Sequence, residues 1–194
     1  MAARPGEPAR AAPRMESSAK PIDTAAAPTV RGERIVALFD RVAGRISPAW
    51  LVYPALFVCD TVLSLLISNI HLIAGFPRAR TVDWATSLLR RDILGGFMIA
   101  IVLVPIIENV LLWAVARGGR ALFRNTDVAI VIAAAVLAAT HLPLDAPRLS
   151  AVFCSFLLQA TVISSRRLPS PFLTAWGIHV THNAFLMALV LAVA

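Results

Sequence analysis

Five apolar stretches, separated by connections that carry arginines, constrain what this chain can fold into more than any other feature. They cover residues 48–70, 93–116, 128–142, 149–164 and 171–194. A helix needs about 20 apolar residues to cross the hydrocarbon layer of a membrane, and several of these stretches approach that length. Because backbone groups in lipid must bond within their own segment, and because the alternation typical of membrane strands is missing, we expect helices.

Composition supports the same class of protein. Of the 194 residues, 58% are hydrophobic and 15% are charged, and the mean hydropathy is +0.76. The sequence therefore predicts an all-α, multi-pass helical membrane protein with about five transmembrane helices. Cys59 and Cys154 fall inside predicted spans with no metal-binding spacing, so we expect both to be small buried apolar side chains.

The amino-terminal part of the chain differs in kind. Residues 1–30 are dominated by Ala, Pro, Arg and Ser without a continuous apolar core, so we expect a disordered tail. Residues 31–47 place apolar side chains at helical spacing among arginines, which predicts an amphipathic helix on a membrane surface. Residues 48–194 are then expected to form a single membrane-embedded helical domain.

The positive charge is expected to meet lipid rather than nucleic acid. The formal net charge is +7, but the arginines are scattered over the tail and the connections and form no patch beside stacking aromatic residues. Basic residues of the surface helix would contact anionic lipid. If the amino terminus is cytoplasmic, that side holds the larger number of arginines, so the positive-inside rule weakly favours this orientation in a bacterial plasma membrane.

Four polar side chains lie within or at the end of these apolar stretches: Glu108, His141, His179 and Asn183. An ionisable group at membrane depth costs about 2.5–3.5 kcal/mol on insertion scales, so it calls for a functional explanation. Glu108 follows Pro105 by one turn, and a proline leaves an earlier carbonyl unpaired and bends the helix. We therefore expect Glu108 to face a gap between helices, where packing through hydrogen bonds is the alternative to chemistry.

In the last stretch, His179, His182 and Asn183 have the spacing i, i+3 and i+4, so they share one helical face. They can bind a metal, orient a water or hydrogen-bond to neighbouring helices, and an interior histidine with satisfied hydrogen bonds is the simplest interpretation of each imidazole alone. Their combination with Glu108 and His141 favours a shared site. Counting about 1.5 Å per residue from the arginines, His141 lies deeper than the others, so a break or tilt near it is required.

Two further polar residues, Asp60 and His182, are expected to have supporting roles. Asp60 lies in the first apolar stretch, where we expect it to face a cavity or to take part in packing. His182 is expected to support the site or to pack against other helices.

The order of these residues resembles a known family. Pro-x-x-Glu ends at Glu108, an apolar residue stands four before His141, and Pro-Ser-Pro-x-x-x-Ala-Trp is followed by the His-x-x-x-Asn of His179 and Asn183. This arrangement, over roughly residues 93–190, looks like the CAAX protease and bacteriocin-processing family of intramembrane glutamate peptidases.

The resemblance implies a mechanism and a partner. Glu108 would act as the general base on a water that His141 helps to hold, and this water would attack a peptide carbonyl. His179 and Asn183 would stabilise the oxyanion, and such donors typically lower a barrier by about 3–4 kcal/mol each. The substrate would be a peptide or protein at the membrane, and no cofactor would be obligatory.

Three positions depart from the motifs of the family. Asn109, Trp113 and Leu137 stand where the family has a second Glu, an Arg and an aromatic residue. The family's second acid and its Arg are four residues apart and could pair, so the loss of both avoids leaving one buried charge alone. The joint change indicates a different support around Glu108.

Two alternatives stay open. The chain could be a catalytically silent relative that keeps the helical frame and binds a membrane partner, for which Asn109 and Trp113 argue. It could also be a metal-binding or ion-conducting membrane protein, in which Glu108, His141 and His179 hold zinc with water as the fourth ligand. Motif spacing identifies neither the natural substrate nor the oligomeric state.

Overall fold

The computed structural model describes residues 32–47, 49–70 and 92–193, and every regular element in these ranges is a helix, which confirms the all-α class. The helices are α1 (Arg34–Ala43), α2 (Val52–Ser68), α5 (Ile93–Met98), α6 (Val104–Phe123), α7 (Thr126–Ala139), α8 (Ala146–Ser164) and α9 (Pro171–Val193); a 3-10 turn, Ala49–Leu51, precedes α2, and a π-helical segment, Ile99–Leu103, joins α5 to α6. The predicted tail, residues 1–30, lies outside the described residues.

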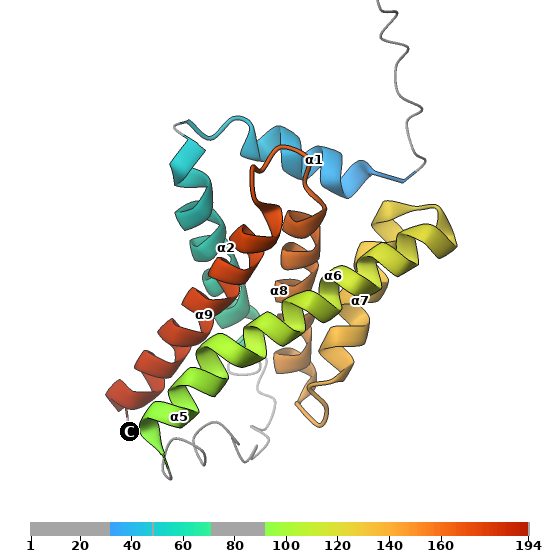
Figure 1. The fold of residues 1–194 in the computed structure, drawn as a ribbon. Helices are drawn as coiled ribbons and strands as arrows, with labels where there is room; N and C mark the ends of the chain where they lie inside the picture. Colours follow the sequence, from blue (N-terminus) through green and yellow to red (C-terminus); the bar gives the residue numbers. More distant parts are fainter. Residues whose placement is uncertain (1–31, 48, 71–91, 194) are drawn as a thin grey trace, which may run out of the picture.

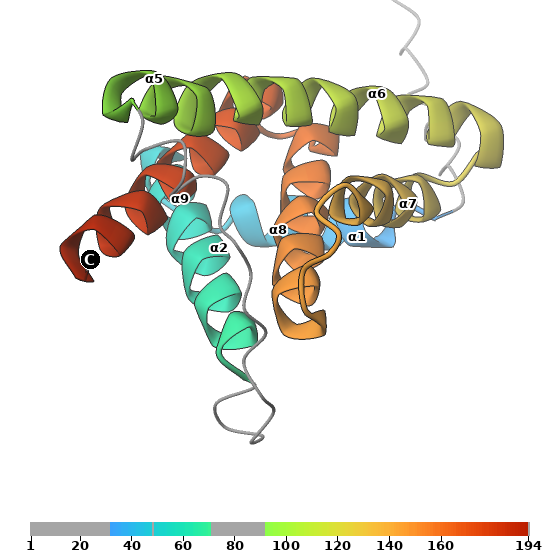
Figure 2. The ribbon, with the colours of Figure 1, turned by 90° about the horizontal axis from the view of Figure 1, so that it is seen from below.

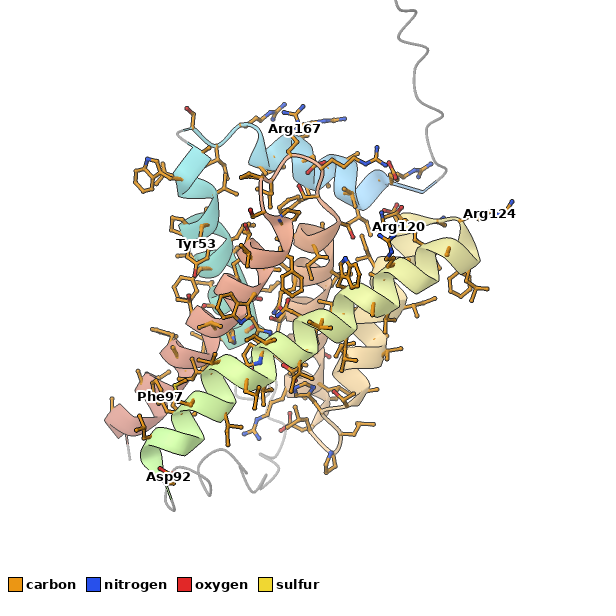
Figure 3. All side chains as sticks on the ribbon, in the orientation of Figure 1. Tyr53, Asp92, Phe97, Arg120, Arg124 and Arg167 are labelled. Atoms are coloured by element: carbon orange, nitrogen blue, oxygen red, sulfur yellow. The ribbon has the colours of Figure 1, made fainter. Side chains whose placement is uncertain are left out.

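The long helix formed by α5, the π-helical segment and α6 runs obliquely across one side of the molecule (Figures 1 and 2). Behind it, α8 holds the central place and packs against α1, α2, α6, α7 and α9. Helix α1 lies across the end at which α2 begins and α8 finishes (Figure 1). Asp92 marks the opposite end of the long helix from Arg120 and Arg124 (Figure 3). This arrangement brings α6, α7 and α9 around α8.

Small side chains dominate the contact between α6, α7 and α8. Ala133, Ala134 and Ala160 are completely buried there. A Cβ added at Gly119 of α6 would lie only 3.2 Å from the Cβ of Ala129 on α7. Small residues let helix backbones approach closely, which is a main source of packing energy between helices in lipid.

Three helical segments are long and apolar enough to cross a membrane: Ala49–Ser68, Leu94–Phe123 and Ala146–Ser164. They match the first, second and fourth predicted stretches and indicate a membrane protein. Helix α7 has 14 residues, so its length is about 21 Å against a hydrocarbon core of about 30 Å. The count of five spans therefore stays a prediction.

Large apolar side chains cover the outer faces of these helices. Leu66 of α2 and Leu111 of α6 are both exposed, as a surface that meets lipid requires. Cys59 also lies exposed on α2 and Cys154 is half-buried, so the expectation that both are buried is wrong. Periodicity shows which residues are apolar, whereas the packing of α2 decides which of them face outward.

Helix α1 forms within the predicted range but is shorter than expected. Gly32, with φ +87°, breaks the helical backbone before it begins. The first turn is capped from α7, because the Asp127 carboxylate accepts hydrogen bonds from the backbone N–H groups of Arg34 (2.8 Å) and Ile35 (3.0 Å). The helix is thereby fastened to the bundle at its amino-terminal end.

Candidate active site

The Glu108 carboxylate lies between the imidazoles of His141 and His179. Its Oε1 is 3.4 Å from His141 Nε2, and its Oε2 is 3.3 Å from His179 Nε2. The exposed fractions of the three side chains are 14% for Glu108, 31% for His141 and 9% for His179. Segments far apart in sequence thus meet in a largely buried cluster that opens toward the His141 side.

His141 reaches the cluster because α7 ends before it. The helix stops at Ala139, and His141 follows in a turn, which supplies the break that its depth requires. The His141 Nδ1 lies 3.1 Å from the carbonyl oxygen of Leu137, which can only accept a hydrogen bond. We infer that Nδ1 carries the hydrogen, so that in the neutral ring Nε2 presents a lone pair toward Glu108.

His179 is held in the opposite tautomer by Asn109. The Asn109 side-chain nitrogen donates to the Pro105 carbonyl (2.9 Å) and lies 3.0 Å from His179 Nδ1. Since an amide nitrogen only donates, Nδ1 of His179 accepts, and its Nε2 carries a hydrogen toward Glu108. Asn109 is completely buried, and its oxygen has no hydrogen-bond partner among the described residues. The two imidazoles therefore offer Glu108 one acceptor and one donor.

Asn183 is bonded to the long helix rather than to Glu108. Its side-chain nitrogen donates to the carbonyl of Ala100, at 3.1 Å, within the π-helical segment. The preceding hydrogen bond of that segment runs from Val104 N–H to the Ile99 carbonyl, an i to i−5 pattern. The next bond of this pattern would run from the N–H of residue 105 to the carbonyl of Ala100. Residue 105 is a proline, which has no N–H. Asn183 thus satisfies the carbonyl that Pro105 leaves unpaired, and the second amide hydrogen remains for other partners.

An aromatic ring from α8 contacts both histidines. The Phe156 ring centroid is 5.5 Å from that of His141 and 5.8 Å from that of His179, and the side chain is 3% exposed. Sequence reasoning missed this residue, because Phe156 belongs to no motif and lies on another helix. Leu137, which stands at the motif's aromatic position, is buried in the core between α6, α7 and α8. The aromatic contact to His141 is therefore made from α8.

The position of the family's Arg lies on the surface in this chain. Trp113 is 45% exposed, and the Arg117 guanidinium lies 5.6 Å above its ring. Arg117 thus packs on Trp113, away from Glu108. Within the described residues, the ion-pair partners of Glu108 are the two imidazoles.

A second buried pair lies one helical turn from His179. His182 Nδ1 is 3.0 Å from Asp60 Oδ2, and Asp60 is only 1% exposed. The separation is that of an ion pair, although neither Asp60 oxygen has a hydrogen bond of good geometry in the described part of the chain. Motif reasoning did not pair them. The available signal was charge balance, because an acid and a base inside apolar helices each need a partner.

The described ranges contain no group of three or more His, Cys, Asp or Glu side chains arranged to hold a metal ion. This finding concerns only residues 32–47, 49–70 and 92–193. The zinc alternative is decided by elemental analysis of the purified protein.

Comparison with known proteins yields no matching family model, no matching curated protein and no matching solved structure. The resemblance to intramembrane glutamate peptidases therefore stays a prediction. What the fold adds is the meeting of Glu108 with two imidazoles of opposite hydrogen-bonding character, which motif spacing does not contain.

Proposed function

We propose that this protein is an intramembrane endopeptidase of the CAAX and bacteriocin-processing type, in which Glu108 activates a water that attacks a peptide bond. One observation carries the proposal: the Glu108 carboxylate lies within 3.4 Å of two imidazoles that come from other segments of the chain. A carboxylate beside fixed donors and acceptors in a largely buried place is the arrangement that general-base hydrolysis needs.

The water would sit against Glu108 Oε1 and the Nε2 lone pair of His141. As its oxygen bonds to the peptide carbonyl carbon, its proton passes to Glu108, and the carbonyl oxygen takes the negative charge. The Nε2–H of His179 would donate to that oxyanion, joined by the second amide hydrogen of Asn183. Glu108 would then return the proton to the leaving amine as the C–N bond breaks.

The substrate would be a peptide or protein segment at the membrane. Glu108 lies within Leu94–Phe123, one of three described helical segments that are long and apolar enough to span a bilayer, so the reaction would take place beside lipid. With α7 and α9 counted, the chain would cross the membrane five times, with its amino terminus in the cytoplasm. A comparison of proteomes from cells with the active and the inactive protein would identify the natural target.

The test replaces the base and the water-holding residue. Glu108→Gln and His141→Ala are each expected to lower the cleavage rate by at least about 10²-fold, the lower end of what general-base catalysis contributes. Glu33→Gln on α1 is the matched control, because it makes the same acid-to-amide change outside the cluster and should leave cleavage intact. Unchanged processing in both site variants would defeat the proposal, provided that all variants insert and fold.

A catalytically silent relative is the second candidate, favoured by the amide at Asn109 and the surface position of Trp113. In that case the unmodified protein would produce no cleavage products and Glu108→Gln would leave partner binding unchanged. The zinc alternative predicts stoichiometric metal in detergent-purified protein and its loss in His179→Ala. Either result would replace the peptidase proposal.

A further inference from the structure

A cavity lined by arginines lies outside the candidate active site, between α1 and the loop that joins α8 to α9. Its volume is about 460 Å³, and it is lined by Ala37, Asp40, Arg41, Gly44, Arg45 and Arg167. Arg167 lies beside α1 at the end of the molecule away from Asp92 (Figure 3). We refer to Arg41, Arg45 and Arg167 as the cavity arginines.

Among the described residues, no acid forms an ion pair with a cavity arginine. Within the described ranges the ion pairs of arginine are those of Arg148 and Arg166, and none involves a cavity arginine. Asp40 is the acid in the lining, but its carboxylate already accepts hydrogen bonds from the Ser165 hydroxyl (2.5 Å) and from the backbone N–H of Arg166 (3.3 Å). The lining thus holds three arginines and one acid, Asp40, whose carboxylate is hydrogen-bonded to the loop between α8 and α9.

Gly44 allows Arg167 to lie close to α1. A Cβ added at this position would lie 2.7 Å from Nη1 of Arg167 and 3.0 Å from the Asp40 carbonyl oxygen. The backbone of Gly44 has φ −68° and ψ −12°, which any residue can adopt, so its conformation does not require glycine. The missing side chain is what lets the Arg167 guanidinium approach α1.

We propose that this cavity binds the phosphate group of an anionic lipid headgroup. Guanidinium groups pair with phosphate oxygens through two parallel hydrogen bonds, and several around one cavity suit a single phosphate. On the same helix, Leu38 is 60% and Val42 is 53% exposed. Exposed apolar side chains next to basic ones place a helix at the boundary between headgroups and acyl chains. The phosphate groups of the lipid headgroups lie at this boundary.

The experiment measures lipid binding to the purified full-length protein in detergent. Phosphatidylglycerol and phosphatidylcholine are titrated separately, and bound lipid is counted by native mass spectrometry. Replacing all three cavity arginines with glutamine should weaken phosphatidylglycerol binding at least about tenfold more than the matched control does. The control replaces Arg34, Arg120 and Arg124 with glutamine, which removes the same charge outside the cavity. Equal weakening in both variants would show a general attraction to positive charge and would overturn the site.

A second variant keeps every charge and fills the space. Gly44→Leu should also weaken phosphatidylglycerol binding about tenfold, because its side chain would take the space that Nη1 of Arg167 now occupies beside α1 and would push that guanidinium out of its place in the cavity lining. Unchanged binding in this variant contradicts the cavity. Inorganic phosphate and glycerol 3-phosphate serve as competitors: displacement of the lipid at equal concentration would assign the cavity to a soluble phosphate compound, whereas no displacement assigns it to the lipid.

Discussion

At Asn109, a single amide decides which nitrogen of His179 carries the hydrogen. The amide nitrogen is held by the Pro105 carbonyl and can only donate, so His179 Nε2 faces Glu108 as a donor. Asn109, which stands where the resembling peptidase motif has a second acid, therefore fixes the tautomer of His179. An acid at this place would accept rather than donate.

Asn109→Asp is expected to lower kcat/KM by about 10²-fold or more, since a wrongly fixed histidine tautomer has cost about 10⁴-fold in a well-studied triad. A carboxylate at position 109 would accept a hydrogen bond from His179, so the ring hydrogen would lie on Nδ1. Nε2 would then have no hydrogen to donate to the oxyanion. Nitrogen NMR of labelled histidine reports the tautomer directly, beside the rate. Asn109→Leu, which imposes neither tautomer, should lose less activity. Equal rates and spectra for the two variants would refute this role.

Among the elements, the π-helical segment and Pro105 couple the long helix to α9. The proline removes the N–H that the Ala100 carbonyl would receive, and the Asn183 amide replaces it at 3.1 Å. A buried carbonyl without a partner costs about 1–3 kcal/mol. The long helix, which carries Glu108, is therefore joined to α9, which carries His179, at the Ala100 carbonyl, about two turns before Glu108.

Asn183→Leu should destabilise the protein by about 1–3 kcal/mol when Pro105 is present, because the Ala100 carbonyl loses its donor. In a Pro105→Ala background the backbone supplies an N–H, so the same change should cost clearly less. The free energy of unfolding is measured in detergent with a rising mole fraction of denaturing surfactant. The unmodified protein, the two single variants and the double variant together form a double-mutant cycle. If Asn183 also serves the oxyanion, cleavage stays impaired in the double variant although stability returns. A cost independent of residue 105 would exclude the coupling.

At the scale of the whole molecule, most arginines of the described ranges lie toward one end, whereas Arg148 lies in the first turn of α8, away from that end. Arg120, Arg124 and Arg167 lie toward the end that α1 covers, and Asp92 lies at the other end (Figure 3). The Asp40 contacts with Ser165 and Arg166 hold α1 to the loop between α8 and α9 at that end. This distribution favours a cytoplasmic location of the α1 end under the positive-inside rule.

The orientation is tested by labelling single cysteines in a variant that lacks Cys59 and Cys154. Ser170→Cys begins α9 at the α1 end, whereas Ile70→Cys follows α2 at the opposite end, and both positions are exposed. A maleimide that does not cross membranes should label Ile70→Cys in intact cells and should label Ser170→Cys only after the membrane is opened. The reverse pattern would contradict a cytoplasmic amino terminus.

The sequence by itself determined the helical class and the polar positions worth examining. Apolar length and the cost of charge in lipid are local properties, so Glu108, His141 and His179 could be selected without coordinates, and the structure brings these three together. Only the tertiary structure decided that Phe156 touches both rings and that Asn183 turns to the Ala100 carbonyl. Contacts between helices depend on tilt, on where a helix stops and on how closely small residues let backbones approach, and none of these is encoded in spacing along one segment.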